Sequence, residues 1–100
     1  MKFQTPRPRE NLANLGRLLG YRLLNNLFNS ELNLVRPLGQ DYPRFHIYLK
    51  EDGPNLLFNL HLDQKRPSYG RETAHSGEYQ GKLVEEEKQR IEQVLANLNS

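Results

Sequence analysis

The sequence predicts a single α+β domain with the element order α-β-β-β-α, in which both helices cover one face of an antiparallel three-stranded sheet and a long loop precedes the last helix. Three observations predict this fold. Apolar residues recur at helical spacing near each end of the chain, and segments between them alternate as strands do. Two of those segments flank an Asp-Gly turn. A chain of 100 residues can bury one modest core, so we expect one domain over residues 1–100.

The first helix is expected to run from Pro8 to Asn29, because proline is tolerated in a first helical turn and leucines follow at helical spacing. Residues 1–7 are expected to be flexible. Gly16 and Gly20 lie four residues apart inside this predicted helix, and each costs about 1 kcal/mol relative to alanine. We therefore expect the helix to approach a neighbouring element closely along that side.

Three strands are expected to follow. Residues 32–38 alternate as a short strand, and Pro37 lacks an N–H, so this strand is expected at an edge of the sheet, at least near Pro37. Residues 44–50 and 55–63 form a hairpin. Folding it about Asp52-Gly53 pairs apolar with apolar residues on one face: Leu49 with Leu56, Ile47 with Phe58, and Phe45 with Leu60. The other face then pairs Tyr48 with Leu57, His46 with Asn59, and Arg44 with His61.

The last helix is expected over residues 82–98, with an apolar stripe that ends at Leu98. Glu87 lies within this stripe, and we expect its side chain to reach the edge of the stripe and not to point inward. Residues 64–80 before the helix form a loop rich in turn-forming residues. Loops of this length are uncommon in compact domains and often have a function.

The most site-like feature is a polar cluster on the open face of the hairpin. His46, His61 and Asp63 share this face, and the long loop brings His75 and Glu78 after the same strand. Imidazoles and carboxylates together suit Zn, Mn or Fe, so these five residues are candidate ligands of a divalent metal. His61, Asp63 and His75 are equally candidates for hydrolytic or acid–base catalysis. The alternative is a polar sheet face with a structural role only.

A second hypothesis is nucleic-acid binding through the loop, where Lys65, Arg66, Tyr69 and Arg71 combine basic side chains with an aromatic ring. Further candidate binding residues are Arg44, Tyr48 and Asn59 on the sheet and Tyr79 near the end of the loop. A third hypothesis is a structural or interaction protein, in which the open sheet face pairs with a second copy as a homodimer.

The composition excludes several classes of site. The chain has no cysteine, which excludes disulfides, thiolate metal sites and a cysteine nucleophile. No apolar run approaches the about 20 residues of a membrane span, and the N-terminus lacks the features of a signal peptide. We therefore expect a cytoplasmic protein that does not interact with membranes.

The segment from Phe58 to Ile91, about a third of the chain, resembles a recurring signature of small uncharacterised bacterial proteins with no assigned activity. The matching parts are His-Leu-Asp-Gln-Lys-x-Pro-Ser-Tyr, then Ala-His-Ser-Gly-Glu-Tyr, and then the acidic start of the last helix. The resemblance implies no function. It marks the positions His61, Asp63, Lys65, Tyr69, His75, Ser76, Glu78 and Tyr79.

Overall fold

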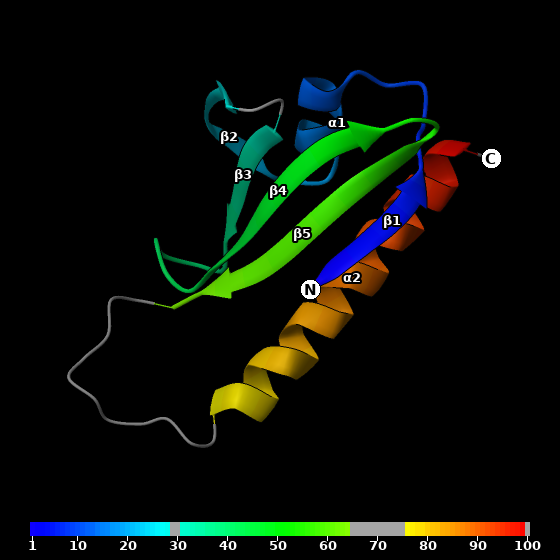
Figure 1. The fold of residues 1–100 in the computed structure, drawn as a ribbon. Helices are drawn as coiled ribbons and strands as arrows, with labels where there is room; N and C mark the ends of the chain where they lie inside the picture. Colours follow the sequence, from blue (N-terminus) through cyan, green and yellow to red (C-terminus); the bar gives the residue numbers. More distant parts are fainter. Residues whose placement is uncertain (29–30, 65–75, 100) are drawn as a thin grey trace.

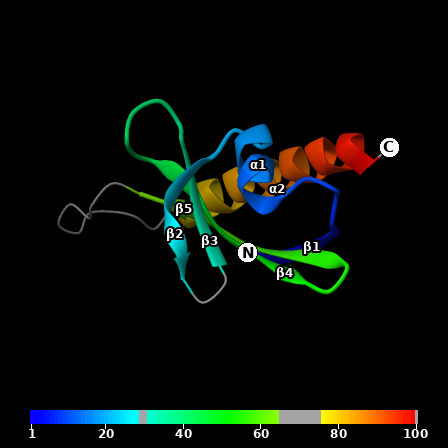
Figure 2. The same cartoon turned by 90° about the horizontal axis from the view of Figure 1, so that it is seen from above.

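The structure, a computed structural model, describes residues 1–28, 31–64 and 76–99 (Figure 1). Its elements are β1 (Lys2–Pro6), α1 (Leu12–Leu18), β2 (Arg22–Phe28), β3 (Glu31–Pro37), β4 (Arg44–Asp52), β5 (Asn55–Asp63) and α2 (Ser76–Asn99). The strands form one five-stranded sheet in the order β1-β5-β4-β3-β2, and every neighbouring pair is antiparallel. Both helices lie on the same side of this sheet (Figure 2). The predicted three-stranded α-β-β-β-α fold is therefore wrong.

The predicted helix over residues 8–29 is replaced by the short helix α1 and the strand β2. Gly20 has a φ of 89°, a left-handed conformation that ends a helix. The amides of Gly20 and Tyr21 donate back to the carbonyls of Arg17 (3.0 Å) and Gly16 (2.9 Å), the hydrogen-bond pattern of a Schellman motif. At the other end, the side chain of Asn11 caps the helix by accepting from the amide of Asn14 at 2.8 Å. The prediction was wrong because leucines continue at helical spacing beyond Gly20, the residue that ends the helix.

Residues 1–7, which we expected to be flexible, contain β1. This strand pairs with β5 along its whole length, from Lys2 opposite Asn59 to Pro6 opposite Asn55. Pro6 is tolerated because β1 is an edge strand and Pro6 is its last residue. The paired residues are 49 to 57 positions apart in the sequence, so local patterns could not indicate the pairing.

The strand that contains Pro37 lies inside the sheet, between β4 and β2. Its pairing with β2 reaches only as far as Val35, which lies opposite Arg22. Pro37 is the last residue of β3 and lies beyond that pairing, so its missing N–H breaks no hydrogen bond to β2. Pro37 therefore has no neighbour in β2, as expected for an edge position, but β3 as a whole is not an edge strand.

The hairpin of β4 and β5 is displaced by two residues from the register that we expected. Its last pair is Asp52 opposite Asn55, so the turn consists of Gly53 and Pro54. Gly53 has a φ of 61°, and proline cannot adopt a positive φ, which matches a type II′ turn with glycine first. Because the displacement is an even number of residues, every side chain keeps its predicted face. His46 now lies directly opposite His61, where we had expected a diagonal arrangement.

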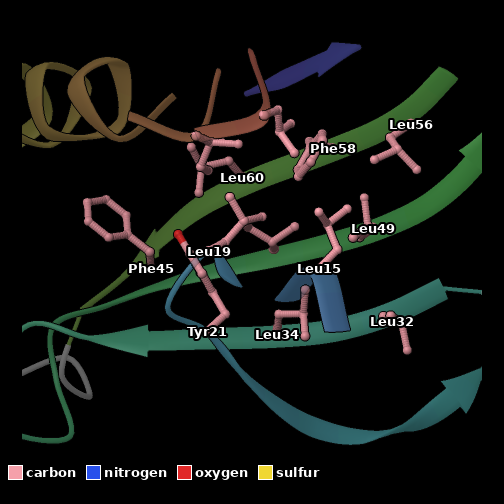
Figure 3. Packing of buried hydrophobic residues seen from close by; sticks show 13 residues of the cluster. Leu15, Leu19, Tyr21, Leu32, Leu34, Phe45, Leu49, Leu56, Phe58 and Leu60 are labelled. Carbon is pink, nitrogen blue, oxygen red and sulfur yellow. The ribbon is translucent and has the colours of Figure 1, made fainter. Parts of the chain in front are cut away.

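The core lies between the helices and the covered face of the sheet (Figure 3). The helical side contributes Leu15 of α1, the C-cap residue Leu19, and Ile91 and Leu95 of α2. They pack on apolar side chains of three strands: Leu32, Leu34, Phe45, Ile47, Leu49, Leu56, Phe58 and Leu60. Gly16 is buried, and a Cβ there would lie 3.0 Å from a methyl carbon of Leu34. The close approach expected from the glycines is therefore present at Gly16, between α1 and β3.

Helix α2 begins at Ser76, earlier than the predicted residue 82. No helix in the described ranges is long and apolar enough to cross a membrane.

Replacing Gly20 with alanine is expected to lower the free energy of unfolding by about 1–2 kcal/mol, because a side chain is disfavoured at a left-handed φ. Gly81 provides the matched control. It lies inside α2 with open space around the position of a Cβ, so Gly81→Ala is expected to raise stability by about 0.5–1 kcal/mol. Chemical denaturation of both variants measures the difference. Equal effects at the two glycines would contradict the assignment of Gly20 as the helix-ending residue.

Candidate functional site

The face of the sheet opposite the helices carries mostly polar side chains, because they alternate with the core residues along each strand. The pairing arranges them in rows that cross the strands. One row holds Arg22, Val35, His46 and His61, the next holds Asn33, Tyr48, Asn59 and Lys2, and the third holds Lys50, Leu57 and Gln4. Val35 is fully buried on this side of the sheet, whereas Tyr48, Leu57 and Asn59 are half-buried and the two lysines are exposed. We call the surface that these rows form the open face.

His46 is held in place on both sides of its ring. Its Nδ1 lies 3.1 Å from a carboxylate oxygen of Asp63, and its Nε2 lies 3.1 Å from the amide oxygen of Asn33. Arg44 also donates to Asp63, over 3.4 Å. With an oxygen at hydrogen-bond distance from each nitrogen, the His46 ring has no nitrogen free to bind a metal. Its role in the structure is to fix the position of its own ring and of Asp63.

An aromatic platform runs across the centre of the open face. The ring centroid of Tyr48 lies 4.6 Å from that of His46, with the planes tilted by 33°, and 5.9 Å from that of His61, edge-on. His61 is exposed, and partial burial, together with the positive charges of the N-terminus and of His46, lowers its pKa below the ordinary value. His61 is therefore neutral near pH 7, where a neutral ring can stack on another flat ring.

A shallow pocket of about 190 Å³ lies beside Tyr48 on this face. Its lining residues come from four strands: Lys2 of β1, Glu31 of β3, Tyr48 and Lys50 of β4, and Leu57, Phe58 and Asn59 of β5. Lys2 and Lys50 are exposed. Sequence reasoning missed Lys2, Glu31 and Lys50. The alternation along β4 already placed Lys50 on this face, whereas Lys2 reaches it only through the long-range pairing of β1.

The predicted metal and catalytic residues are only partly brought together. His46, His61 and Asp63 lie on one face, as their alternation indicates. His75 lies outside the described residues. For residues 76–80, which include Glu78, the structure describes the backbone but not the side chains. Within the described part of the chain, no group of three or more histidine, aspartate or glutamate side chains is placed to hold a metal ion. The loop candidates Lys65, Arg66, Tyr69 and Arg71, and the side chain of Tyr79, are likewise outside what the structure describes.

A separate charged cluster is buried beneath α2, on the other side of the sheet. Glu87 is only 3 % exposed, so the expectation that it lies at the edge of the helix stripe is wrong. Its carboxylate accepts hydrogen bonds from the Tyr21 hydroxyl (2.6 Å), from Arg36 (3.0 and 3.2 Å) and from Arg90 (2.9 Å at each oxygen). Arg90 also donates to the carbonyl of Leu19 at 2.6 Å. Three partner residues for one carboxylate explain why a charged residue occupies the apolar side of the helix.

The protonation states follow from these contacts. Burial alone would raise the pKa of Glu87, but hydrogen bonds from Arg90, Arg36 and Tyr21 outweigh it and hold that pKa below its ordinary value. Burial and hydrogen bonding to Glu87 raise the pKa of Tyr21 well above its ordinary value. Glu87 is therefore charged and Tyr21 neutral over a wide pH range. The cluster connects α2 to the C-cap of α1 through Leu19, to β3 through Arg36, and to Tyr21, which precedes β2. The Glu87 carboxylate is buried and therefore not accessible to a ligand.

Comparison of the chain with models of known families, with curated proteins and with solved structures found no match.

Proposed function

We propose that this chain is a binding module for single-stranded nucleic acid and that the open face of the sheet is its binding surface. The observation that carries the proposal is the position of Tyr48. It lies half-buried on the open face, where its ring contacts those of His46 and His61, and it is beside a pocket that two exposed lysines line. Proteins that bind single strands combine such aromatic platforms with positive charge along the backbone path.

The aromatic platform suits unpaired bases. A base that stacks on an aromatic side chain contributes about 1–3 kcal/mol, and the contact tolerates any sequence because every base has a flat face. The His46 ring is fixed by Asp63 and Asn33, so the edge of the platform is rigid before a ligand arrives. A rigid platform loses less conformational entropy on binding. Asn59 lies beside Tyr48 in the same row and would supply an amide group for a base edge.

The charge distribution suits a polyanion. Lys2 and Lys50 are exposed on the open face, and none of the salt bridges among described residues involves either of them. The whole chain carries a net charge of +2. The segment after β5 in the sequence contains Lys65, Arg66 and Arg71 and adds to the positive charge of the chain. Pairing of this face with a second copy would instead bring like charges together, which argues against a homodimer at this surface.

The proposal predicts that Tyr48→Ala lowers the affinity for a labelled ten-nucleotide single strand by roughly 5- to 150-fold, because one base loses its stacking partner. Tyr48→Phe keeps the ring and is expected to retain most of the affinity. Fluorescence anisotropy with RNA and DNA oligonucleotides measures both. The affinity of the wild-type chain is also expected to fall steeply as salt rises.

Matched lysine variants test the surface. Lys50→Ala is expected to reduce the slope of log affinity against log salt by about 1, because one phosphate contact is lost. Lys88→Ala, on α2 on the opposite side of the sheet, is expected to leave the slope unchanged. A slope near zero for the wild-type chain, or equal affinities for Tyr48→Ala and Tyr48→Phe, would rule out this function.

A further inference from the structure

We infer that the pocket beside Tyr48 is a subsite for one guanine base, which gives the proposed single-strand binding a sequence preference. The inference rests on the proposed function, since it names the base that the open face selects. Glu31 and Lys50 are the residues that would make the selection, with Tyr48 as the stacking wall.

The size of the pocket fits a single base. Its volume of about 190 Å³ is below the roughly 300–1,000 Å³ of pockets that hold a drug-sized ligand. Tyr48 contributes an aromatic wall and Leu57 an apolar floor, which suit the face of a flat ring. Because the pocket opens onto the same surface as the aromatic platform, a base in the pocket and a neighbouring base on His61 can belong to one strand.

Two side chains of opposite character lie next to one another at this pocket. Leu32 of β3 is paired with Leu49 of β4, so the next residues along the two strands, Glu31 and Lys50, are neighbours on the open face. No salt bridge within the described ranges uses either side chain. The carboxylate can only accept hydrogen bonds and the ammonium can only donate them.

This pair complements the Watson–Crick edge of guanine. Guanine presents two adjacent N–H donors, at N1 and N2, followed by the acceptor O6. A carboxylate can accept from both donors while an ammonium donates to O6, and lysine is a common partner of O6 in nucleic-acid complexes. Adenine and cytosine each offer one donor on this edge, beside ring acceptors that the carboxylate would repel. Uracil offers one donor between two acceptors.

The presence of Glu31 is itself informative. A surface that bound phosphate alone would gain nothing from a carboxylate beside Lys2 and Lys50, because the carboxylate repels the backbone. Phosphate contacts position a strand, whereas contacts to base edges determine which sequence binds. A carboxylate among lysines therefore fits a base-reading role.

The test uses fluorescence anisotropy with the full chain and ten-nucleotide oligouridine probes that carry guanosine, inosine, adenosine or cytidine at one central position. The guanosine probe is expected to bind about tenfold more tightly than oligouridine, in line with one good two-point base contact. Inosine lacks the N2 amino group and is expected to lose most of that gain. Glu31→Gln is expected to bring all probes within about twofold of one another, because the amide replaces one acceptor with a donor. Glu86→Gln, an exposed residue of α2, is the matched control and should keep the preference for guanosine.

The outcomes separate this inference from the function on which it rests. If oligouridine binds with the expected salt dependence but guanosine gives no gain, or if Glu31→Gln keeps the gain, the guanine subsite is wrong and the binding function stands. If no probe binds at low salt, the proposed function fails and the subsite fails with it. Thermal unfolding of Glu31→Gln shows that a lost preference does not come from a lost fold.

Discussion

Replacing Glu87 with alanine is expected to lower the free energy of unfolding by about 3–5 kcal/mol, the usual cost of removing one partner from a buried ion pair. The reason lies in the groups that remain. Tyr21, Arg36 and Arg90 all donate to this carboxylate, and without it Arg36 and Arg90 would stay half-buried with no described anion to balance them. Because a domain of this size has a total stability of about 5–15 kcal/mol, the variant is expected to be close to unfolding.

The matched control is Glu86→Ala, one residue earlier on α2 and exposed, which is expected to change stability by less than about 0.5 kcal/mol. Urea denaturation followed by circular dichroism measures both. A difference below about 1 kcal/mol between the two variants would show that the buried cluster adds little to stability.

The same cluster determines the dependence of stability on pH. The folded-state pKa of Glu87 is lowered, so its contribution is present above the unfolded pKa and is lost as pH falls through the folded pKa. The folded-state pKa of Tyr21 is raised, so its contribution is present below the unfolded pKa and is lost as pH rises beyond that value. Denaturation of wild type and Glu87→Ala across pH should therefore show the wild-type advantage shrinking at both the acidic and the alkaline limits.

Phe58→Ala is expected to lower the free energy of unfolding by about 3–5 kcal/mol, the range for removing a buried phenylalanine ring. Phe58 is fully buried in the middle of β5 (Figure 3). Its ring stacks on that of Phe3, with the centroids 4.9 Å apart. The cavity would open between β1, β5 and α2, where Lys88 lies 5.8 Å from the Phe3 ring. Removing the Phe58 ring should therefore also weaken the attachment of the edge strand β1 to the sheet.

The neighbouring residue supplies the control. Leu57 points to the open face and is half-buried, so Leu57→Ala is expected to cost clearly less. Chemical denaturation of the two variants compares adjacent positions with opposite orientations. Equal losses at Phe58 and Leu57 would mean that the assignment of the two faces of β5 is incorrect.

Local patterns in the sequence predicted the faces of the hairpin, the apolar residues of the last helix and the proximity of His46, His61 and Asp63. These features depend on alternation between adjacent residues, which survives a register displacement of two. The helical spacing of the leucines gave a wrong prediction after Gly20, because Gly20 ends the helix and the following leucines belong to β2. Local patterns also failed for β1 and for Lys2, because their place is decided by pairing with β5, far away in the sequence.

The buried position of Glu87 could not be predicted for a related reason. Its partners Tyr21 and Arg36 come from segments 66 and 51 residues away, and only the folded chain gathers them around the carboxylate. A glutamate between apolar helix positions is consistent with either an edge or an interior location. The number of hydrogen-bond donors that surround it decides between the two.

The position of β1 also has a consequence for how the molecule is made. β1 pairs with the strand that ends at Asp63, so it has no partner until β5 has been synthesised. The hairpin of β4 and β5 needs only neighbouring residues and can form earlier, since short-range contacts close faster than long-range ones. Lys2 arrives with β1, and with it one wall of the pocket beside Tyr48. The nascent chain therefore completes this surface only with the long-range pairing of β1 with β5.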